Sequence, residues 1–230
     1  MLHGVSMDFP QGAFTAIVGE SGCGKSTVAS VLTGRCRGYT GSAALSGGEI
    51  SALSADSLLR TVTYVGFSSY LFRGTVAENL RMARPDADDA SLWDVLERVR
   101  LAGFLRGERG LDTPLDAQGA NLSGGQRQAM ALLMSTMTPI EFLILDEHTA
   151  ALDPKTAETI MELTGKIVKE KKLTTIMVTH NLRYAVEYGD RLLMMHQGRA
   201  VVDKEDKEKQ ALCIDDILEK FNEISIECGN

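Results

Sequence analysis

The chain has 230 residues, of which 44% are hydrophobic and 24% are charged, an ordinary balance for a globular protein with its own core. A formal net charge of −7 argues against a nucleic-acid-binding surface as its main feature. No apolar run approaches the roughly 20 residues that a membrane helix needs, and the first residues lack a signal-peptide pattern. The four cysteines lack metal-ligand spacing and are expected to be free thiols in a reducing cytosol: Cys23, Cys36, Cys213 and Cys228.

The first elements predict a strand, a turn, a second strand and a helix. Apolar and polar residues alternate from Leu2 to Phe9, which predicts a strand, and a turn follows at residues 10–12. Residues 13–18 predict a short buried strand, and residues 27–32 a helix. Between these two lies Gly19-Glu20-Ser21-Gly22-Cys23-Gly24-Lys25-Ser26, which matches the phosphate-binding loop G-x-x-x-x-G-K-[ST].

A loop of this kind gathers donors for phosphate. Its glycines let the backbone approach a ligand closely, and the positive end of the following helix dipole faces the same point. We expect Lys25 to reach the β- and γ-phosphates of ATP, the Ser26 hydroxyl to ligate Mg²⁺, and Thr27 to complete the nucleotide-binding set. The alternative is a chance glycine-rich turn, which would not account for a complete motif between a strand and a helix.

The next hundred residues predict loops, one strand and then helices. Residues 35–49 indicate loops with short strands, residues 54–60 a helical turn, and residues 61–65 a strand. Residues 75–106 are mainly helical in pattern. Thr75 and Glu78 form a capping-box pattern, and Ser91 is the expected cap of a second helix. The apolar face of that helix consists of Leu92, Val95, Leu96 and Val99.

Two further stretches carry chemistry. Leu122-Ser123-Gly124-Gly125-Gln126 precedes a helix predicted at residues 127–137, which alone is a weak signal for an anion site. Residues 142–145 predict a buried strand that delivers Asp146 and Glu147 at its carboxyl end. We expect Asp146 to hold Mg²⁺, directly or through water, and Glu147 to polarise the attacking water. Solvated acids after a strand are the alternative, and the phosphate-binding loop upstream disfavours it.

The last third of the chain alternates helix and strand. A turn at Asp153-Pro154 precedes a helix at residues 155–169, and a strand at residues 174–179 ends at His180, which we expect to contact phosphate rather than to be structural. Residues 192–195 and 200–202 flank a hairpin turn at 197–198. Residues 203–210 indicate a solvated charge run. Residues 214–221 predict a closing helix whose apolar stripe docks on the core rather than on a partner.

Together these motifs resemble the ATP-binding cassettes of ABC transporters, and the resemblance covers nearly the whole chain. Residues 19–26 match the Walker A element and residues 122–126 the signature. The Walker B element ends at Asp146 and is followed by Glu147, the catalytic carboxylate. The D-loop resembles Ala150-Ala151-Leu152-Asp153, and His180 stands at the position of the switch histidine.

The resemblance implies a P-loop NTPase fold: an α/β RecA-like core with an antiparallel β region and a helical insert. Residues 1–230 would form one domain, with residues 1–66 and 129–230 as the core and 67–128 as the insert and signature. It also implies hydrolysis of ATP to ADP and phosphate with Mg²⁺, coupled to transport. The implied location is cytoplasmic, on the inner face of the cell membrane, against a transmembrane permease domain.

In this family two cassettes pair head to tail, as a homodimer or a heterodimer. Each ATP then lies between the Walker A element of one protomer and the signature of the other. Ser123 and Gly125 would contact the γ-phosphate bound by the partner, with Gly124, Gln126 and Asp153 completing the nucleotide site. A single chain would carry an incomplete site.

Three departures from the family pattern leave other functions open. Phe67 stands where the Q-loop glutamine is expected, and it cannot ligate Mg²⁺ or orient water. The aromatic adenine platform normally precedes the first strand seen here, and residues 113–119 only loosely resemble the exporter coupling loop. One alternative is therefore a folded cassette that binds nucleotide but turns over poorly. An ABC ATPase outside transport is another, although no long coiled-coil insert or tandem cassette is evident.

The composition changes along the chain. Residues 1–127 contain eleven arginines and one lysine, whereas residues 128–230 contain three arginines and nine lysines. The family resemblance changes too: residues 71–80 resemble exporter cassettes, and residues 146–156 and 177–182 resemble free-standing importer-type subunits. We therefore hypothesise a recombinant or engineered fusion with its junction near residues 122–128, the alternative being a natural cassette with drifted composition.

Overall fold

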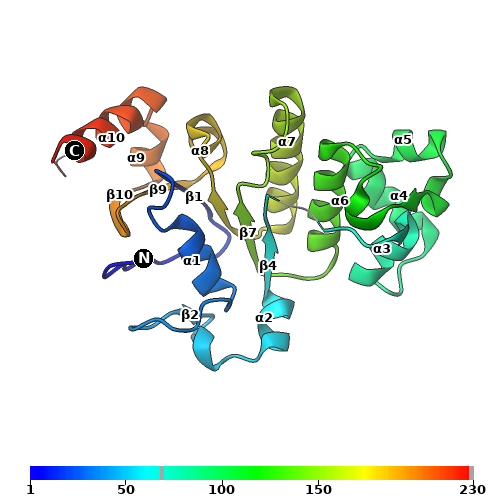
Figure 1. The fold of residues 1–230 in the computed structure, drawn as a ribbon, viewed down its shortest axis with the longest axis horizontal. Helices are drawn as coiled ribbons and strands as arrows, with labels where there is room; N and C mark the ends of the chain where they lie inside the picture. The colour runs from blue at the N-terminus through cyan, green and yellow to red at the C-terminus, as the bar shows by residue number, and fades with distance from the viewer. Residues whose placement is uncertain (68–69, 228–230) are drawn as a thin grey trace. The chain divides into compact units, whose positions relative to one another are not determined.

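The computed structural model describes residues 1–67 and 70–227 and divides into two compact units (Figure 1). The first, here called the sheet unit, comprises residues 1–64, 141–147 and the chain from 171 onward. The second, the helical unit, comprises residues 65–140 and 148–170. Each unit draws on segments that are distant in the sequence, and each is described by itself.

A six-stranded sheet forms the centre of the sheet unit, in the order β10-β9-β1-β8-β7-β4. The strand β1 pairs in parallel with β8 and β9, β8 pairs in parallel with β7, and β9 pairs antiparallel with β10. The bounds are β1 Phe14–Gly19, β4 Val62–Val65, β7 Phe142–Asp146, β8 Thr174–Val178, β9 Arg191–His196 and β10 Arg199–Glu205. A separate hairpin pairs β2 (Ala44–Leu45) with β3 (Gly48–Glu49).

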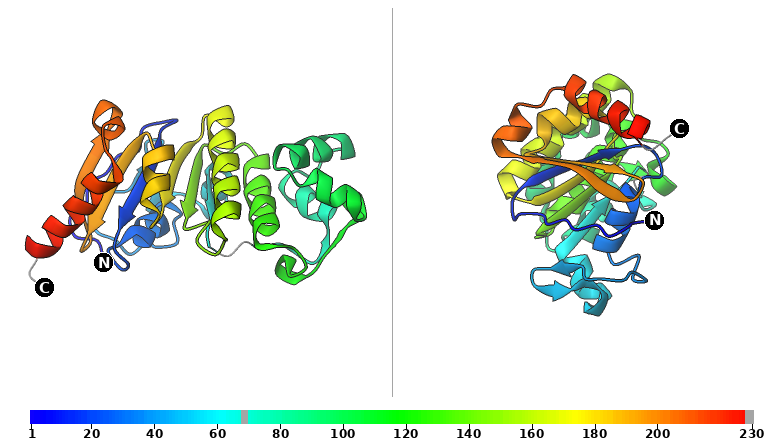
Figure 2. Two further views of the ribbon diagram at one scale, coloured as in Figure 1. Left: turned by 90° about the horizontal axis from the view of Figure 1, so that it is seen from above. Right: turned by 90° about the vertical axis from the view of Figure 1, so that its left-hand side faces the viewer.

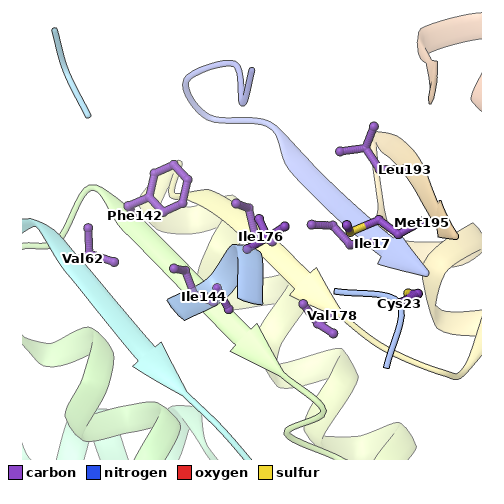
Figure 3. Close-up of a cluster of buried hydrophobic side chains, with 11 residues drawn as sticks. Ile17, Cys23, Val62, Phe142, Ile144, Ile176, Val178, Leu193 and Met195 are labelled. Carbon is purple, nitrogen blue, oxygen red and sulfur yellow. The ribbon is translucent and has the colours of Figure 1, made fainter. Parts of the chain in front are cut away.

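The central strands are buried on both faces, which explains their almost continuous apolar sequences. Side chains that alternate along β1, β7, β8 and β9 point to one face, and helix α1 (Lys25–Leu32) covers that face with Val28 and Ala29. Figure 3 shows this layer of the core: Ile17, Cys23, Val62, Phe142, Ile144, Ile176, Val178, Leu193 and Met195.

The other helices of the sheet unit are short except at its end. They are α2 (Ala55–Thr61), α8 (Leu182–Tyr188), α9 (Asp206–Gln210) and α10 (Ile214–Glu227). Helices α8 and α10 lie on the face of the sheet opposite α1, and α10 contacts α8 (Figure 2). Ile217 is 2% exposed, so the closing helix docks on the core as predicted, although it runs further than predicted.

The helical unit packs short helices around leucines that are fully buried, among them Leu80, Leu92, Leu96 and Leu132. Helix α3 contacts α6, and a two-residue pairing joins β5 to β6. The bounds are β5 Gly74–Thr75, α3 Val76–Ala83, α4 Asp89–Arg98, α5 Ala102–Gly107, β6 Pro114–Leu115, α6 Gly124–Met137 and α7 Pro154–Lys171. Over residues 1–67 and 70–227, the structure contains no helix with the length and apolar character to cross a membrane.

The prediction of a strand from Leu2 to Phe9 is wrong. Leu2, Met7 and Phe9 do pack against the core, so the alternation of apolar residues reports burial correctly. The backbone, however, forms hydrogen bonds with a hairpin turn and with a side chain, and not with a neighbouring strand. The N–H of His3 donates to the Gly198 carbonyl (2.9 Å), and the Asp8 carbonyl accepts from Arg191 Nη1 (2.7 Å).

The predicted cap of the second helix is also wrong. Helix α4 begins after Asp88, whose carboxylate accepts from the Ser91 N–H at 2.9 Å, so Ser91 lies in the first turn. Both residue types are good caps, and an acid also favours the positive helix end. The capping box of Thr75 and Glu78 is confirmed, with both reciprocal hydrogen bonds present.

Most of the charged stretch at residues 203–210 is exposed, as the sequence predicts, and Lys209 is the buried exception. Its first residues extend the hairpin as β10, and Asp203 pairs with the buried Arg191, whose Nε lies 2.6 Å from Asp203 Oδ1. Lys209 is 7% exposed and donates to the Val186 carbonyl. Asp203 thus compensates the buried charge of Arg191, and the Val186 carbonyl gives the buried ammonium of Lys209 an acceptor. Cys23, Cys36 and Cys213 are free thiols, and Cys228 lies outside the described residues.

Candidate nucleotide-binding site

The phosphate-binding loop lies between β1 and α1, as predicted, and the helix begins at Lys25. Gly24 has φ +109°, a left-handed conformation that side chains rarely adopt. A Cβ there would also lie 2.8 Å from Leu2 Cδ2. The glycine thus permits both the backbone conformation and close contact with the first residues of the chain.

Lys25 is 5% exposed, and its ammonium is held by the loop itself. Nζ donates to the carbonyls of Gly19 (2.7 Å) and Glu20 (2.8 Å) and lies 3.9 Å from Cys23 Sγ. An ammonium that is buried needs such acceptors to offset the loss of water. The cation is therefore fixed at the centre of the loop, where phosphate oxygens would be bound.

A hairpin turn that sequence reasoning did not connect with the site supports the loop from outside. The turn at Gln197 and Gly198 joins β9 to β10, and the Gly198 N–H donates to the Cys23 carbonyl at 2.9 Å. Inside the loop, the Cys23 N–H donates to the Glu20 carbonyl at 3.3 Å. Both backbone polar groups of Cys23, its N–H and its carbonyl, are thereby hydrogen-bonded.

Asp146 ends β7 and is 8% exposed. Its two oxygens have different partners: Ser26 Oγ donates to Oδ1 at 3.4 Å, and the Tyr64 hydroxyl donates to Oδ2 at 3.0 Å. The contact with Ser26 brings together the two residues predicted to hold Mg²⁺. Burial, and next the negative charge of Asp146, raise the pKa of Tyr64 above its ordinary value.

Glu147 and His180 form a second contact at the site, with 2.6 Å between Glu147 Oε1 and His180 Nε2. Glu147 has φ +52°, a left-handed conformation that costs a non-glycine residue on the order of 1–3 kcal/mol. Its N–H donates to the Val178 carbonyl at 2.9 Å, which holds the strained residue in place. Both side chains are partly exposed and thus accessible to a ligand.

One edge of the sheet gathers these residues. Ile17 of β1 is level with Val178 of β8, and Val178 is level with Asp146 of β7. Because the three strands are parallel neighbours, their carboxyl ends lie at the same edge, where ligands of open α/β sheets bind. The structure therefore brings together the loop at 19–26, Asp146, Glu147 and His180, all within the sheet unit.

The donor set suits a magnesium ion that arrives with a nucleotide. Within residues 1–67 and 70–227 there is no group of three or more His, Cys, Asp or Glu side chains that could hold a metal alone. Mg²⁺ is usually held by one or two protein oxygens, together with water and substrate phosphates. A hydroxyl and a buried carboxylate at 3.4 Å, beside a phosphate-binding loop, match that requirement.

The signature residues belong to the helical unit and begin helix α6. The helix starts at Gly124, three residues earlier than predicted, because Ser123 is its cap and Gln126 completes a capping box. The Gln126 side chain is therefore engaged with the Ser123 backbone. Ser123 itself is exposed at the positive end of a 14-residue helix.

Gly125 and Asp153 shape the start of helix α7 in the same unit. A Cβ at Gly125 would lie 2.3 Å from Thr156 Cγ2, so the two helix starts approach closely only with glycine there. Asp153 Oδ1 accepts from the Thr156 N–H at 3.1 Å and so caps α7. The side-chain hydrogen bond with Thr156 is the largest cause holding the pKa of Asp153 below its usual range.

Two further residues of the helical unit stand at or next to predicted motifs in the sequence, Phe67 and His148. Phe67 is 60% exposed, while Ser68 and Ser69, which follow it at the expected Q-loop, lie outside the described residues. His148 directly follows Glu147 and is 3% exposed, with Nε2 3.3 Å from Thr164 Oγ1. Burial lowers the pKa of His148 to about 4.

Comparison with known proteins agrees with this geometry. A sequence profile described as ABC transporter matches residues 2–150 of the chain. The chain belongs to the ABC transporter family. Members of this family bind ATP and are ATPases that energise transport, and this ABC protein carries the P-loop NTPase fold expected of its ATP-binding part.

Several relatives resemble this ABC protein over most of its length. It is 41% identical to the tyrosine transport ATP-binding protein of Clostridioides difficile over 227 residues, 96% of this chain and 90% of that protein. It is 33% identical to the mycobactin import ATP-binding/permease protein IrtA of Mycolicibacterium smegmatis over 202 residues, 87% of this chain but 23% of that protein. A bacterial Atm1-family ABC exporter solved with ATP bound superposes with a TM-score of 0.81 at 28% identity, covering 100% of this chain and 39% of the exporter.

Proposed function

We propose that this ABC protein binds Mg-ATP at residues 19–27 and hydrolyses it to ADP and phosphate, and that this energy drives transport through a membrane permease. One observation carries the proposal: Lys25, Ser26, Asp146 and Glu147 follow two parallel strands of the sheet, β1 and β7, at the same edge, with Ser26 Oγ 3.4 Å from Asp146 Oδ1. That arrangement can hold a triphosphate and its metal while a carboxylate acts on water.

Catalysis would rest on positioning and electrostatics with little covalent chemistry. Lys25 and the N–H groups at the start of α1 bind the phosphates, since a helix N-terminus offers unpaired donors. Ser26 and Asp146 would hold Mg²⁺, which neutralises charge that develops on the phosphates. Glu147 orients the attacking water and accepts its proton, and His180, oriented by its 2.6 Å contact with Glu147, donates to the γ-phosphate.

The assembly belongs to the same proposal. The whole chain would act as one cassette, with residues 1–66 and 129–230 as core and 67–128 as helical insert. A second cassette would contribute Ser123 and Gly125 to the ATP held by this one, with Gly124, Gln126 and Asp153 supporting that surface. One relative is named an ATP-binding/permease protein, which supports a permease partner, and the cassette would lie against that permease at the cytoplasmic face of the membrane.

Nucleotide binding is tested by calorimetric titration of the purified chain with Mg-ATP. Wild-type protein should bind saturably, and Lys25→Ala should weaken binding by roughly 100-fold because the buried charge-assisted contacts are lost. Lys155→Ala, at an exposed position in α7, is the matched control and should bind like wild type. Binding that Lys25→Ala leaves intact would contradict the proposed site.

Hydrolysis is tested by steady-state phosphate release. Glu147→Gln should keep Mg-ATP binding and lose on the order of 100- to 1,000-fold in turnover, because the general base is removed. The exposed Phe67 at the expected Q-loop favours a second function, a cassette that binds nucleotide but scarcely turns over. A wild-type rate equal to that of Glu147→Gln would select that second function.

A further inference from the structure

Tyr64 lies at the candidate magnesium site without a role in the mechanism above. It belongs to β4, the edge strand next to β7, and its hydroxyl donates to Asp146 Oδ2 at 3.0 Å. The other oxygen of the same carboxylate, Oδ1, faces Ser26 Oγ at 3.4 Å. The carboxylate thus has one oxygen engaged by the protein core and one directed to the phosphate-binding loop.

We propose that Tyr64 is a positioning residue for the metal site: it fixes the Asp146 carboxylate so that one oxygen serves Mg²⁺, and Arg35 fixes Tyr64 in turn. The inference rests on the proposed function, because it concerns the metal that accompanies the nucleotide. Tyr64 acts through Asp146 and touches no reacting atom.

The geometry of magnesium explains why such a partner is useful. Mg²⁺ demands nearly ideal octahedral coordination, so a carboxylate serves it best with one oxygen in a fixed direction, either directly or through a bound water. A carboxylate free to rotate could offer both oxygens in several orientations. The hydrogen bond from Tyr64 removes that freedom, in the way that partners behind metal ligands generally orient them.

Arg35 completes the support from the solvent side. Its guanidinium carbon lies 4.1 Å from the centre of the Tyr64 ring, which is within the range of a cation–π contact. Arg35 follows helix α1, whereas Tyr64 lies on a strand, so the contact joins two elements around the site. Arg35 itself is exposed, and it covers a ring that is only partly buried.

The test measures metal dependence of binding and needs no turnover. A fluorescent non-hydrolysable ATP analogue is titrated with the whole chain in EDTA and over a range of Mg²⁺ concentrations. In Tyr64→Phe, the Mg²⁺ concentration for half-maximal enhancement should rise about 10-fold, the scale seen when such supporting partners are lost. Affinity in EDTA should stay at the wild-type value, because the phosphate contacts of Lys25 are untouched.

Tyr39→Phe is the matched control. The Tyr39 hydroxyl donates to Glu49 Oε1 at 2.7 Å, the same kind of bond in the same unit but not at the loop. It should leave the Mg²⁺ dependence unchanged. Arg35→Gln should shift it in the same direction as Tyr64→Phe, by a smaller factor of roughly three. In an Asp146→Asn background, Tyr64→Phe should add nothing, since the carboxylate it orients is gone.

The outcomes separate this inference from the function on which it rests. Tyr64→Phe with the wild-type Mg²⁺ dependence would overturn it. So would equal losses of affinity with and without Mg²⁺, since that result would show a structural role only. Wild-type protein whose analogue binding does not respond to Mg²⁺ would overturn the proposed metal site itself, and this inference with it.

Discussion

His148 is a histidine that the fold keeps neutral. It is 3% exposed, and burial alone lowers its pKa to about 4. The Thr164 hydroxyl donates to the Ile160 carbonyl at 2.8 Å, so its oxygen is left to accept from His148 Nε2. That partner selects the tautomer with hydrogen on Nε2. A proton added to this ring would place an uncompensated charge in the core.

The free energy of unfolding should therefore fall in mild acid, and the titration of His148 should account for part of that fall. An unfolded histidine titrates near 6.5, so between pH 6.5 and about 4 the unfolded chain binds more protons than the folded chain. Stability then rises with pH across that window and is lost as pH falls. At about pH 4, the titration of His148 should lower the free energy of unfolding by about 3 kcal/mol relative to neutral pH.

The measurement is chemical denaturation of the wild type and of His148→Gln at several pH values, in EDTA without nucleotide. The variant should lose less stability between pH 6.5 and 4, because its side chain does not titrate. His3→Gln, at an exposed position, should follow the wild-type profile. Parallel profiles for wild type and His148→Gln would show that the buried ring contributes no acid sensitivity.

The residues that form the candidate site could be predicted from the sequence, but the residues that hold them in position could not. Lys25, Ser26, Asp146 and Glu147 follow motifs whose spacing reflects their chemistry, and the structure places them at one sheet edge. Tyr64 was missed because no motif marks it. Its hydroxyl meets Asp146 only because β4 lies beside β7, and that strand order is a property of the folded sheet.

At the scale of elements, Asn79 explains how helix α3 is joined to the segment before it. Asn79 is fully buried and forms three hydrogen bonds to backbone groups. Its Oδ1 accepts from the Phe72 N–H (2.8 Å), and Nδ2 donates to the carbonyls of Phe72 (2.9 Å) and Thr75 (3.0 Å). The Asn79 side chain thus forms the hydrogen bonds with the Phe72 backbone that a neighbouring strand would otherwise form.

Asn79→Ala should destabilise the chain by about 2–4 kcal/mol, since it removes a fully buried side chain together with its three hydrogen bonds. Asn121 makes the same kind of contact in an exposed loop, accepting from the Asp116 N–H and donating to the Pro114 carbonyl. Asn121→Ala should cost less than about 1 kcal/mol, because water replaces the lost bonds. Denaturation by urea measures both, and equal losses would contradict the role assigned to burial.

Helices and strands could be predicted where the local sequence pattern matches the hydrogen-bonding partner that the fold provides. The strand β1, the capping box of α3 and the hairpin turn at Gln197 all appear where the sequence indicates. Residues 2–9 carry a strand pattern but lack a ladder partner, so burial was predictable and pairing was not. At α4, the cap was predicted at Ser91, but the helix begins three residues earlier because Asp88 accepts from the Ser91 N–H.

At the scale of the whole molecule, the composition changes near residue 127, from mostly arginine to mostly lysine among the basic residues. Arginine and lysine behave similarly on a solvated surface, so either composition supports the same fold. The fusion hypothesis stays a prediction, and the gene itself tests it. An uninterrupted native gene for all 230 residues would contradict it.

The phosphate-binding loop and the signature belong to different units of the chain, and the proposed head-to-tail pairing would complete each site with two chains. Lys25 belongs to the sheet unit, whereas Ser123 caps α6 in the helical unit and is exposed. In a head-to-tail dimer, the loop of one copy would pair with the signature of the other. Variants that damage only one half of the site should therefore complement each other.

Lys25→Ala inactivates the phosphate-binding loop of the chain that carries it. Ser123→Arg blocks the signature of its chain and leaves the phosphate-binding loop intact. Each variant alone should release phosphate at background rates. An equal mixture should recover roughly a quarter of wild-type activity, because half of the dimers are mixed and each mixed dimer holds one intact site of two. Wild-type activity without any recovery in the mixture would show that each site is completed within one chain. If wild-type protein is inactive alone and gains activity when a different cassette is added, a heterodimer would be favoured over a homodimer. If it stays inactive, the cassette that binds nucleotide but scarcely turns over would be favoured.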